Sequence, residues 1–469
     1  MEWPRGVAAP ARRALEAAGI TDLEQACRYG RARLARLHGM GPRALRALEE
    51  AAHERGLSLR PLWDCDHRAH RDGHRRGYSV GIDPRFQGVA VSEQTPEKRR
   101  HPVRIVVVSL MVVAVLALGG IGAAGWYFSG EVIDVDHSPA EYSLTVTGVE
   151  DGRVTLPADE DTLRPGTWGL EWDGGRAVMG PVRAIEGTTV TREVLAVLEG
   201  DLAEGLAVSV DRYTYGDDPE QAFGIDYEDV TVSGPLGDYP GWYVPGEGDT
   251  WVIAVHGRNA SPRETLRALP AIVEAGFPYL AVTYRNDEGA PAAPDGNHHL
   301  GASEWEDVAA AVDYARGEGA EDVVLYGWSM GGSLVAEAYR NMDSSPVRAM
   351  IVDSPVMDWD STLDMQADDR DVPGVVTWSA KRIVEWRSNL SIDGLDQRSW
   401  AGELDVPMLG FVDTADETVD HTATLEFFDA APPDLVEVVE TSAGHTASWN
   451  ADSEAYERAV VEFLGRLRA

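Results

Sequence analysis

The sequence predicts an α/β fold with a mostly parallel sheet in its C-terminal half, and two observations support this. Residues 226–469 contain a series of short apolar runs, each of a length suited to a buried strand. Helical patterns near 262–275, near 303–317 and from 330 onward separate several of these runs. Apolar strands that alternate with helices form parallel sheets with helices on both faces. At 469 residues, with 44% hydrophobic residues, the chain is also long enough for further domains.

The chain begins with a segment, residues 1–60, that reads as a small helical domain. Within it the stretch LHGMGPRAL, residues 37–45, resembles the helix-hairpin-helix motif, and the whole segment resembles the small helical domain at the C-terminus of the RNA polymerase α subunit. Two glycines before a helix leave backbone N–H groups available to a phosphate, which is how that motif holds DNA. The resemblance implies weak contact with DNA. A helical module that binds a protein partner is the alternative.

Residues 61–104 show no clear periodicity and read as a basic linker. One cysteine and three histidines lie close together in it, but their spacing fits no structural zinc pattern, so we expect no metal there: Cys65, His67, His70 and His74. The other cysteine, Cys27, also precedes the apolar segment described next. The remainder of the chain therefore has no disulfide and no thiol chemistry.

Residues 105–128 carry no charge and are long enough, at about 1.5 Å per residue, to cross a bilayer as one helix. Basic residues precede this segment and acidic residues follow it: Lys98, Arg99, Arg100 and Arg104, then Glu131, Asp134 and Asp136. The positive-inside rule therefore predicts a cytoplasmic N-terminus and an extracytoplasmic C-terminal part in the cell membrane. Two alternatives are a cleaved signal peptide, if translation starts just upstream of Lys98, and a buried core helix.

Charge is distributed unevenly along the chain. The net charge is −37, yet the first 104 residues are basic, so the acidic excess lies entirely beyond the apolar segment. This argues against nucleic acid or anionic lipid as a partner of the C-terminal part.

Residues 131–225 show alternating runs broken by turn residues and predict a small β-rich domain. The turns fall at Glu150-Asp151-Gly152 and at Asp173-Gly174-Gly175. No catalytic constellation is visible in this segment. We expect the domain either to stand off the membrane or to cover the next domain.

The stretch Gly327-Trp328-Ser329-Met330-Gly331 ends one apolar run and opens a helical pattern. A G-x-S-x-G sequence in that context predicts a nucleophile elbow, in which a serine sits on a strained turn and the two glycines let strand and helix approach closely. We therefore interpret Ser329 as a nucleophile rather than as a polar turn residue.

A serine nucleophile needs a base and an acid that orients the base. His445 follows the last apolar run, which gives the chain order serine, acid, histidine, and is the predicted base. Three aspartates compete for the acid role. Asp416 is the predicted acid because it follows an apolar run in a D-x-x-V pattern, whereas Asp353 and Asp413 are expected to cap loops or to be solvated.

The oxyanion hole is expected to use the backbone N–H groups of Met330 and Arg258. His256 and Gly257 end an apolar run immediately before Arg258 and are expected to support this loop, while the Arg258 side chain could meet an acidic substrate group or, more simply, be solvated. His298 and His299 could line the substrate entrance.

Residues 226–469 thus resemble the α/β-hydrolase superfamily, in particular its serine aminopeptidase-like and related bacterial extracytoplasmic members. The resemblance implies hydrolysis of a small-molecule ester, thioester or peptide without metal or organic cofactor, and a cap at the insert 357–403. Four tryptophans of the insert could line an acyl pocket or, for most of them, pack the cap: Trp359, Trp378, Trp386 and Trp400. Two other functions are a non-catalytic binding protein on the same fold and a membrane tether that acts through residues 1–60.

Overall fold

The computed structural model describes residues 102–468 continuously and, of the preceding segment, residues 4, 7, 9–18, 20–29, 34, 37 and 42–55. The chain divides into two compact units, Met1–Glu97 and Lys98–Ala469, which are described separately.

The first unit is helical, as predicted, with α1 (Ala9–Ala17), α2 (Leu23–Tyr29) and α4 (Pro42–Glu54). These helices pack around a small apolar core that includes Leu15 and Leu48. The two glycines of the motif-like stretch lie outside the described residues, as do Cys65 and its neighbouring histidines. DNA contact by this unit therefore stays a prediction.

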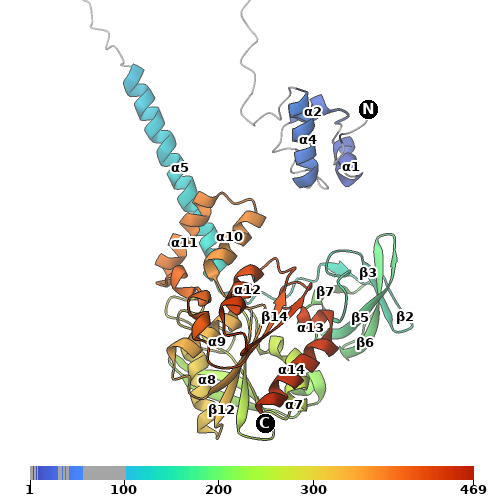
Figure 1. The fold of residues 1–469 in the computed structure, drawn as a ribbon. Coiled ribbons are helices and arrows are strands. Elements are labelled where there is room, and N and C mark those ends of the chain that lie inside the picture. The colour runs from blue at the N-terminus through green and yellow to red at the C-terminus, as the bar shows by residue number, and fades with distance from the viewer. Residues whose placement is uncertain are drawn as a thin grey trace, which may run out of the picture. The chain divides into compact units, whose positions relative to one another are not determined.

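The second unit opens with the long helix α5 (Pro102–Ile133), which contains the predicted span of residues 105–128 (Figure 1). Its stretch Val106–Ile133 is long and apolar enough to cross a membrane. Side chains from Val106 to Leu118 are exposed, so the interpretation of this segment as a core helix is wrong. The helix continues beyond residue 128 because Ser129 and Ile133 are buried against the rest of the unit.

A seven-stranded antiparallel sheet follows, with strand order β1-β7-β4-β5-β6-β3-β2. Both predicted hairpins are confirmed, since β2 pairs with β3 across Asp151-Gly152 and β4 pairs with β5 across Asp173-Gly174. A core of aliphatic and tryptophan side chains lies on this sheet. The strands are β1 (Leu144–Thr145), β2 (Gly148–Glu150), β3 (Arg153–Pro157), β4 (Trp168–Trp172), β5 (Gly175–Glu186), β6 (Thr189–Glu199) and β7 (Ala207–Asp211).

After the short helix α6 (Pro219–Phe223) the chain forms the predicted α/β domain, whose sheet has eight strands in the order β15-β14-β13-β12-β10-β11-β9-β8. Strands from β11 to β15 in this order are parallel, and β8 and β9 add an antiparallel edge. The strands are β8 (Glu228–Gly234), β9 (Gly237–Val244), β10 (Thr250–Val255), β11 (Tyr279–Val282), β12 (Asp322–Trp328), β13 (Val347–Asp353), β14 (Met408–Asp413) and β15 (Val436–Thr441).

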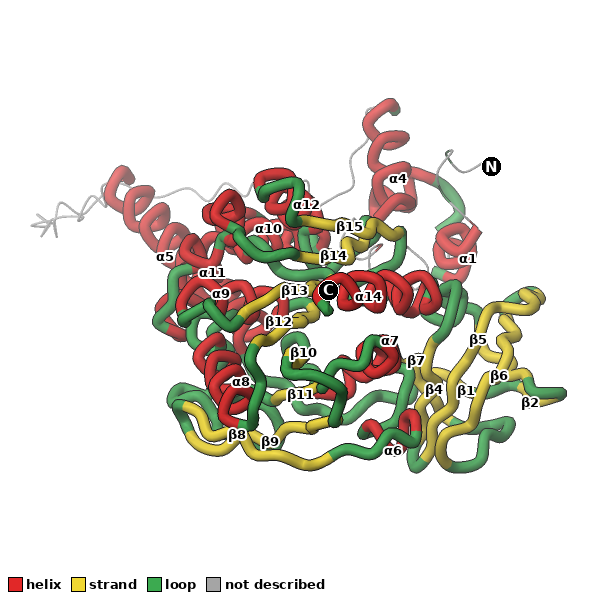
Figure 2. The backbone as a smooth tube through the Cα atoms, turned by 60° about the horizontal axis from the view of Figure 1, so that its bottom comes forward, coloured by secondary structure: helices red, strands yellow, loops and turns green. Residues whose placement is uncertain are grey.

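Helices cover both faces of this sheet, each over its own apolar cluster (Figure 2). One face is covered by α8 (Trp305–Gly317), α9 (Met330–Asn341) and α12 (His421–Ala430). The other face is covered by η1 (Pro262–Ala268), α7 (Leu269–Glu274) and α14 (Ser453–Leu467), with α13 (Ser448–Ala451) beside α14. The all-apolar strands are thus buried on both sides, which confirms the predicted fold class.

The insert between β13 and β14 forms the cap. It consists of α10 (Trp359–Asp369), α11 (Gly374–Ser388), η2 (Ile392–Leu395) and η3 (Gln397–Glu403). Helix α11 runs beside the C-terminal half of α5 (Figure 1).

Candidate active site

Ser329 lies between the end of β12 and the start of α9 with φ 52° and ψ −120°, a conformation that costs a non-glycine residue energy. The turn is tight on both sides. A Cβ on Gly327 would collide with the backbone of Gly331, and a Cβ on Gly331 would collide with the Val255 carbonyl oxygen. Glycine is therefore required at both positions by close backbone approach. The turn carries Ser329 away from the sheet at the carboxyl end of a central strand.

The structure brings Ser329, His445 and Asp416 together from three separate loops. His445 Nε2 lies 2.8 Å from Ser329 Oγ, and His445 Nδ1 lies 2.7 Å from Asp416 Oδ2. Asp416 is buried, and its Oδ1 accepts hydrogen bonds from the N–H groups of Thr418 and Val419 at 2.7 and 2.9 Å. These two bonds fix the carboxylate so that its second oxygen faces the imidazole.

The structure also shows the surroundings of Asp353 and Asp413, the two aspartates that were not predicted to be the acid. Both are buried, so the expectation that they are solvated is wrong. Asp413 accepts hydrogen bonds from the hydroxyls of Ser354 and Ser448 and from the Ala447 N–H, which caps the loop after His445. Burial and the nearby Asp413 charge raise the pKa of Asp353 to about 7.

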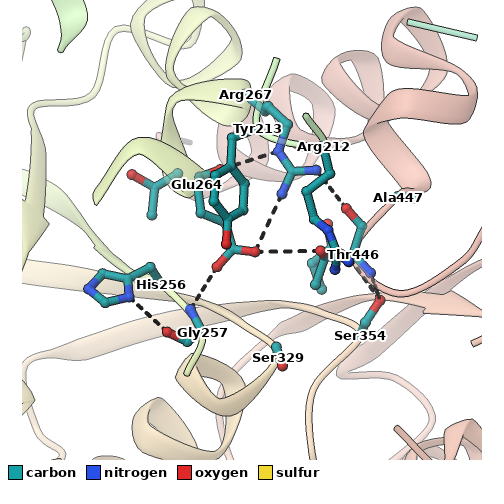
Figure 3. A network of polar contacts seen from close by, with 12 residues as sticks. Arg212, Tyr213, His256, Gly257, Glu264, Arg267, Ser329, Ser354, Thr446 and Ala447 are labelled. Atoms are coloured by element: carbon teal, nitrogen blue, oxygen red, sulfur yellow. Dashed lines mark hydrogen bonds and ion pairs between the residues drawn. The ribbon is translucent and has the colours of Figure 1, made fainter. Parts of the chain in front are cut away.

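The loop after β10 is held by buried polar contacts. The Gly257 N–H donates to Glu264 Oε2 at 2.7 Å (Figure 3). His256 Nε2 lies 2.9 Å from Asp287 Oδ2. Burial opposes protonation of His256, but the Asp287 charge outweighs it and raises its pKa. The ring also stacks on Tyr284, with centroids 4.6 Å apart. These contacts place the loop beside the elbow.

The Arg258 side chain is not solvated, contrary to the simpler expectation. Its NH1 donates to the carbonyl oxygens of Val132 and Glu131, at 3.0 and 3.2 Å, in the last turn of α5. A cation at a helix C-terminus interacts favourably with the unpaired carbonyls there. Met330 is the first residue of α9, so its N–H has no hydrogen-bond acceptor within that helix.

His298 and His299 do not line an open entrance. His298 is buried, its Nε2 lies 2.7 Å from Asn259 Oδ1, and burial lowers its pKa to about 3, so the ring is neutral. The His298 N–H donates to the Ile133 carbonyl at 2.8 Å, which adds a second link to the end of α5. His299 pairs with Asp295 at 3.0 Å.

A polar cleft of about 390 Å³ lies on one side of Ser329. The β-rich domain supplies part of its wall with Glu171, Asp211, Arg212 and Tyr213. Arg212 donates to the His445 carbonyl at 3.4 Å, and Asn450 of α13 donates to the Arg212 carbonyl at 3.0 Å. The β-rich domain therefore covers the α/β domain at its site, the second of the two arrangements expected for it.

The cleft residues of the β-rich domain were missed by sequence reasoning, as was Glu264. No local pattern marks them, because they act across a contact between domains. The available signal was indirect: the short segment after residue 207 is rich in charged and tyrosine residues and leads directly into the α/β domain.

Ser329 also lines a small pocket of mixed character, whose apolar side includes Val356, Trp359, Leu363 and Val419. Of the four cap tryptophans, Trp359 lines this pocket and Trp400 packs on Phe427, with ring centroids 5.2 Å apart. Trp378 and Trp386 do neither, since they are 63% and 73% exposed. The expectation that most of the four pack the cap is wrong for these two.

Two family models match the chain. Residues 265–467 match the prolyl oligopeptidase family. The C-terminal half of this protein thus has an α/β-hydrolase fold and is similar to a family of serine hydrolases. Residues 145–211 match a domain of unknown function, which corresponds to the strands of the β-rich domain.

Solved structures that resemble the chain include two esterases. The esterase of Pyrococcus furiosus is 19% identical, with a TM-score of 0.44, and the match covers 54% of this chain and 97% of that one. The esterase of Exiguobacterium antarcticum is 17% identical, with a TM-score of 0.38 and coverage of 50% and 99%. No curated protein matches the chain.

Proposed function

We propose that this protein is a membrane-anchored serine hydrolase that cleaves a carboxylic ester through an acyl-enzyme. One observation carries the proposal: a single imidazole, His445, lies within hydrogen-bond distance of both Ser329 and Asp416. That geometry lets a histidine take the serine proton while the aspartate holds its tautomer and stabilises its cation. The strained backbone of Ser329 supports the same role.

In the first half-reaction, Ser329 Oγ attacks the ester carbonyl carbon while His445 Nε2 takes the hydroxyl proton. The carbonyl oxygen becomes an oxyanion, and the N–H groups of Met330 and Arg258 are the proposed donors to it. The carbon–oxygen bond to the alcohol then breaks, and His445 gives its proton to the leaving alcohol. Preorganised donors of this kind are worth about 10²–10³ in rate each.

In the second half-reaction, a water molecule gives a proton to His445 and attacks the acyl carbon. Collapse of the second tetrahedral intermediate releases the carboxylic acid and returns the proton to Ser329. Glu264 and His256 hold the loop that carries Arg258, so we assign them a positioning role.

The proposed anchor is α5. Its apolar stretch from Val106 is exposed, whereas its last turn is fixed to the hydrolase domain by Arg258 and His298. By the positive-inside rule, the charge pattern around the span supports a cytoplasmic N-terminal segment and an active site outside.

Hydrolysis of p-nitrophenyl esters from C2 to C12 by the full chain in detergent tests the proposal, with Ser329→Ala and His445→Ala as matched variants. We expect both variants to lose at least about 10³-fold in kcat. A peptide p-nitroanilide in parallel distinguishes peptidase from esterase activity. If the wild type hydrolyses no substrate and is not labelled by a fluorophosphonate probe, the binding-protein alternative replaces the enzyme.

A further inference from the structure

We propose that the substrate is a lipid-like acyl ester that enters from the membrane, with its chain along the apolar side of a cavity between α5 and the cap. This inference rests on the proposed function and adds the substrate class and its route. The exposed face of α11 would lie in the interfacial layer of the same membrane.

The cavity that would hold the chain measures about 140 Å³ and is built partly from the anchor itself. The apolar part of its lining comes mainly from the last turns of α5 and from the two long cap helices: Phe128, Val132, Leu363, Ala367, Ala380 and Val384. Polar and charged side chains form the rest of the lining: Glu131, Arg258, Gln366, Arg370, Thr377 and Lys381. A hydrolase whose substrate came from bulk water would have no need of a membrane anchor as a pocket wall. From this wall we infer that the substrate comes from the membrane in which α5 would lie.

A narrower pocket of about 40 Å³ adjoins the cavity and shares lining residues with it. Both spaces are lined by Val132, Leu363, Gln366 and Arg258, and the narrower one reaches Ser329. An acyl chain whose carbonyl lies at Ser329 can thus extend between α10 and α5. Its polar alcohol would occupy the cleft on the other side, which Glu171, Asp211 and Arg212 line.

Helix α5 is held firmly against α11, so the cavity keeps its shape and its position. A Cβ on Gly125 would collide with the Ser379 side chain, which shows how closely the two helices approach. Arg387 of α11 donates to Ser129 Oγ at 3.0 Å and to Asp134 at 2.8 Å, and it lies over the Trp126 ring at 4.8 Å. These contacts run in the same direction along both helices, so α5 and α11 are parallel.

The depth of α11 follows from this pairing. About 20 helical residues at about 1.5 Å each cross the roughly 30 Å apolar layer. Counted from Val106, that length ends at Gly125, beside Ser379, and Trp126 and Tyr127 then fall at the interface, where aromatic side chains accumulate. The N-terminal half of α11 is therefore at the level of the membrane surface.

The exposed face of α11 carries side chains of the kinds that suit the interfacial layer of a membrane. It consists of residues at helical spacing, Val375, Trp378, Arg382 and Trp386, and the two tryptophans are 63% and 73% exposed. The Trp386 ring lies 6.2 Å from that of Trp126, so the apolar face of α11 is continuous with the anchor. Tryptophans with an arginine on one helix face favour insertion among lipid headgroups.

The test uses the full chain reconstituted in phosphatidylcholine vesicles and compares two esters. p-Nitrophenyl acetate in water reports on the triad alone, and p-nitrophenyl palmitate dissolved in the vesicles reports on entry through the cavity. Ala367→Trp fills the cavity, and Ala310→Trp on α8 is the matched control. We expect Ala367→Trp to lower the ratio of palmitate to acetate hydrolysis at least tenfold, whereas Ala310→Trp should leave that ratio within twofold of the wild type.

A second measurement does not depend on that variant. Trp378→benzoylphenylalanine, irradiated in the vesicles, should form an adduct with one phospholipid, whereas Glu454→benzoylphenylalanine on α14 should not. Absence of the adduct at residue 378, or hydrolysis of acetate but not of vesicle-borne palmitate by the wild type, overturns the inference and leaves the proposed function in place. A wild type inert toward both esters overturns the proposed function itself.

Discussion

Arg258 donates a hydrogen bond of 3.0 Å to the carbonyl oxygen of Val132 and so joins the loop beside the nucleophile to the last turn of α5. The same residue lines both the polar cleft and the apolar cavity. The helix that would anchor the protein is thus in direct contact with the loop that would stabilise the oxyanion.

Loss of this contact should impair both activity and stability. In Arg258→Ala the backbone N–H remains but its loop loses two hydrogen bonds from a charged donor, each worth about 1.5–3 kcal/mol. We expect kcat for a short ester to fall about tenfold, because small misplacement of a catalytic group is costly. Arg382→Ala, on the exposed face of α11, also removes one positive charge and serves as the control. Equal kcat values for Arg258→Ala and the wild type would contradict a positioning role for the side chain.

The elbow glycines should tolerate no side chain. Gly331→Ala places a methyl group against the Val255 carbonyl, so we expect a loss of more than about 4 kcal/mol in the free energy of unfolding or a failure to fold. Gly465→Ala in the last turn of α14 meets no atom within 4 Å and should stabilise the protein by up to about 0.5–1 kcal/mol. Denaturant unfolding measures both values. A fully stable Gly331→Ala variant would show that the backbone there is less crowded than described.

Asp416→Asn should preserve the structure and abolish most of the activity. The amide oxygen can still accept the N–H groups of Thr418 and Val419, but the amide nitrogen would face His445 Nδ1 and favour the wrong tautomer. We expect kcat to fall by about 10³–10⁴ with little change in Tm. Calorimetry and ester kinetics on the same sample separate the two effects. Retained activity would reassign the acid.

Asp353 should make the protein less stable as pH rises. Its folded pKa of about 7 exceeds the ordinary value of 3.8, so the folded state binds the proton more tightly than the unfolded state between these pH values. Its contribution to stability is therefore complete below about pH 4 and is lost as pH rises to about 7. Asp353→Asn keeps an acceptor for Tyr456 and removes the titration. We expect the Tm of Asp353→Asn relative to the wild type to increase between pH 5 and pH 8. A constant difference would contradict the raised pKa.

Much of the fold was predictable because its signals are local. The apolar runs became strands β8 to β15, and the G-x-S-x-G stretch lies between a strand and a helix as its pattern requires. The two hairpins of the β-rich domain were marked by their turn residues in the same way.

The rest of the site depends on contacts between distant segments. Sequence order alone left three aspartates for the acid, and only the fold shows which one reaches His445. Arg258 seemed free to be solvated because its partners lie on α5, far away in sequence. The exposure of Trp378 and Trp386 was also unforeseen, since apolar content in a cap suggests packing and does not reveal which face has no neighbour.

The continuity of α5 limits where the protein can work. A flexible linker between the anchor and the domain would let the catalytic serine reach substrates at a distance from the membrane, and that distance would grow with the length of the linker. Here one helix runs from Pro102 to Ile133 and ends within the walls of the pocket, so no such linker exists between them. With α5 as the proposed anchor, the active site would stay at a fixed distance from the membrane, and a substrate would have to be brought to the membrane surface.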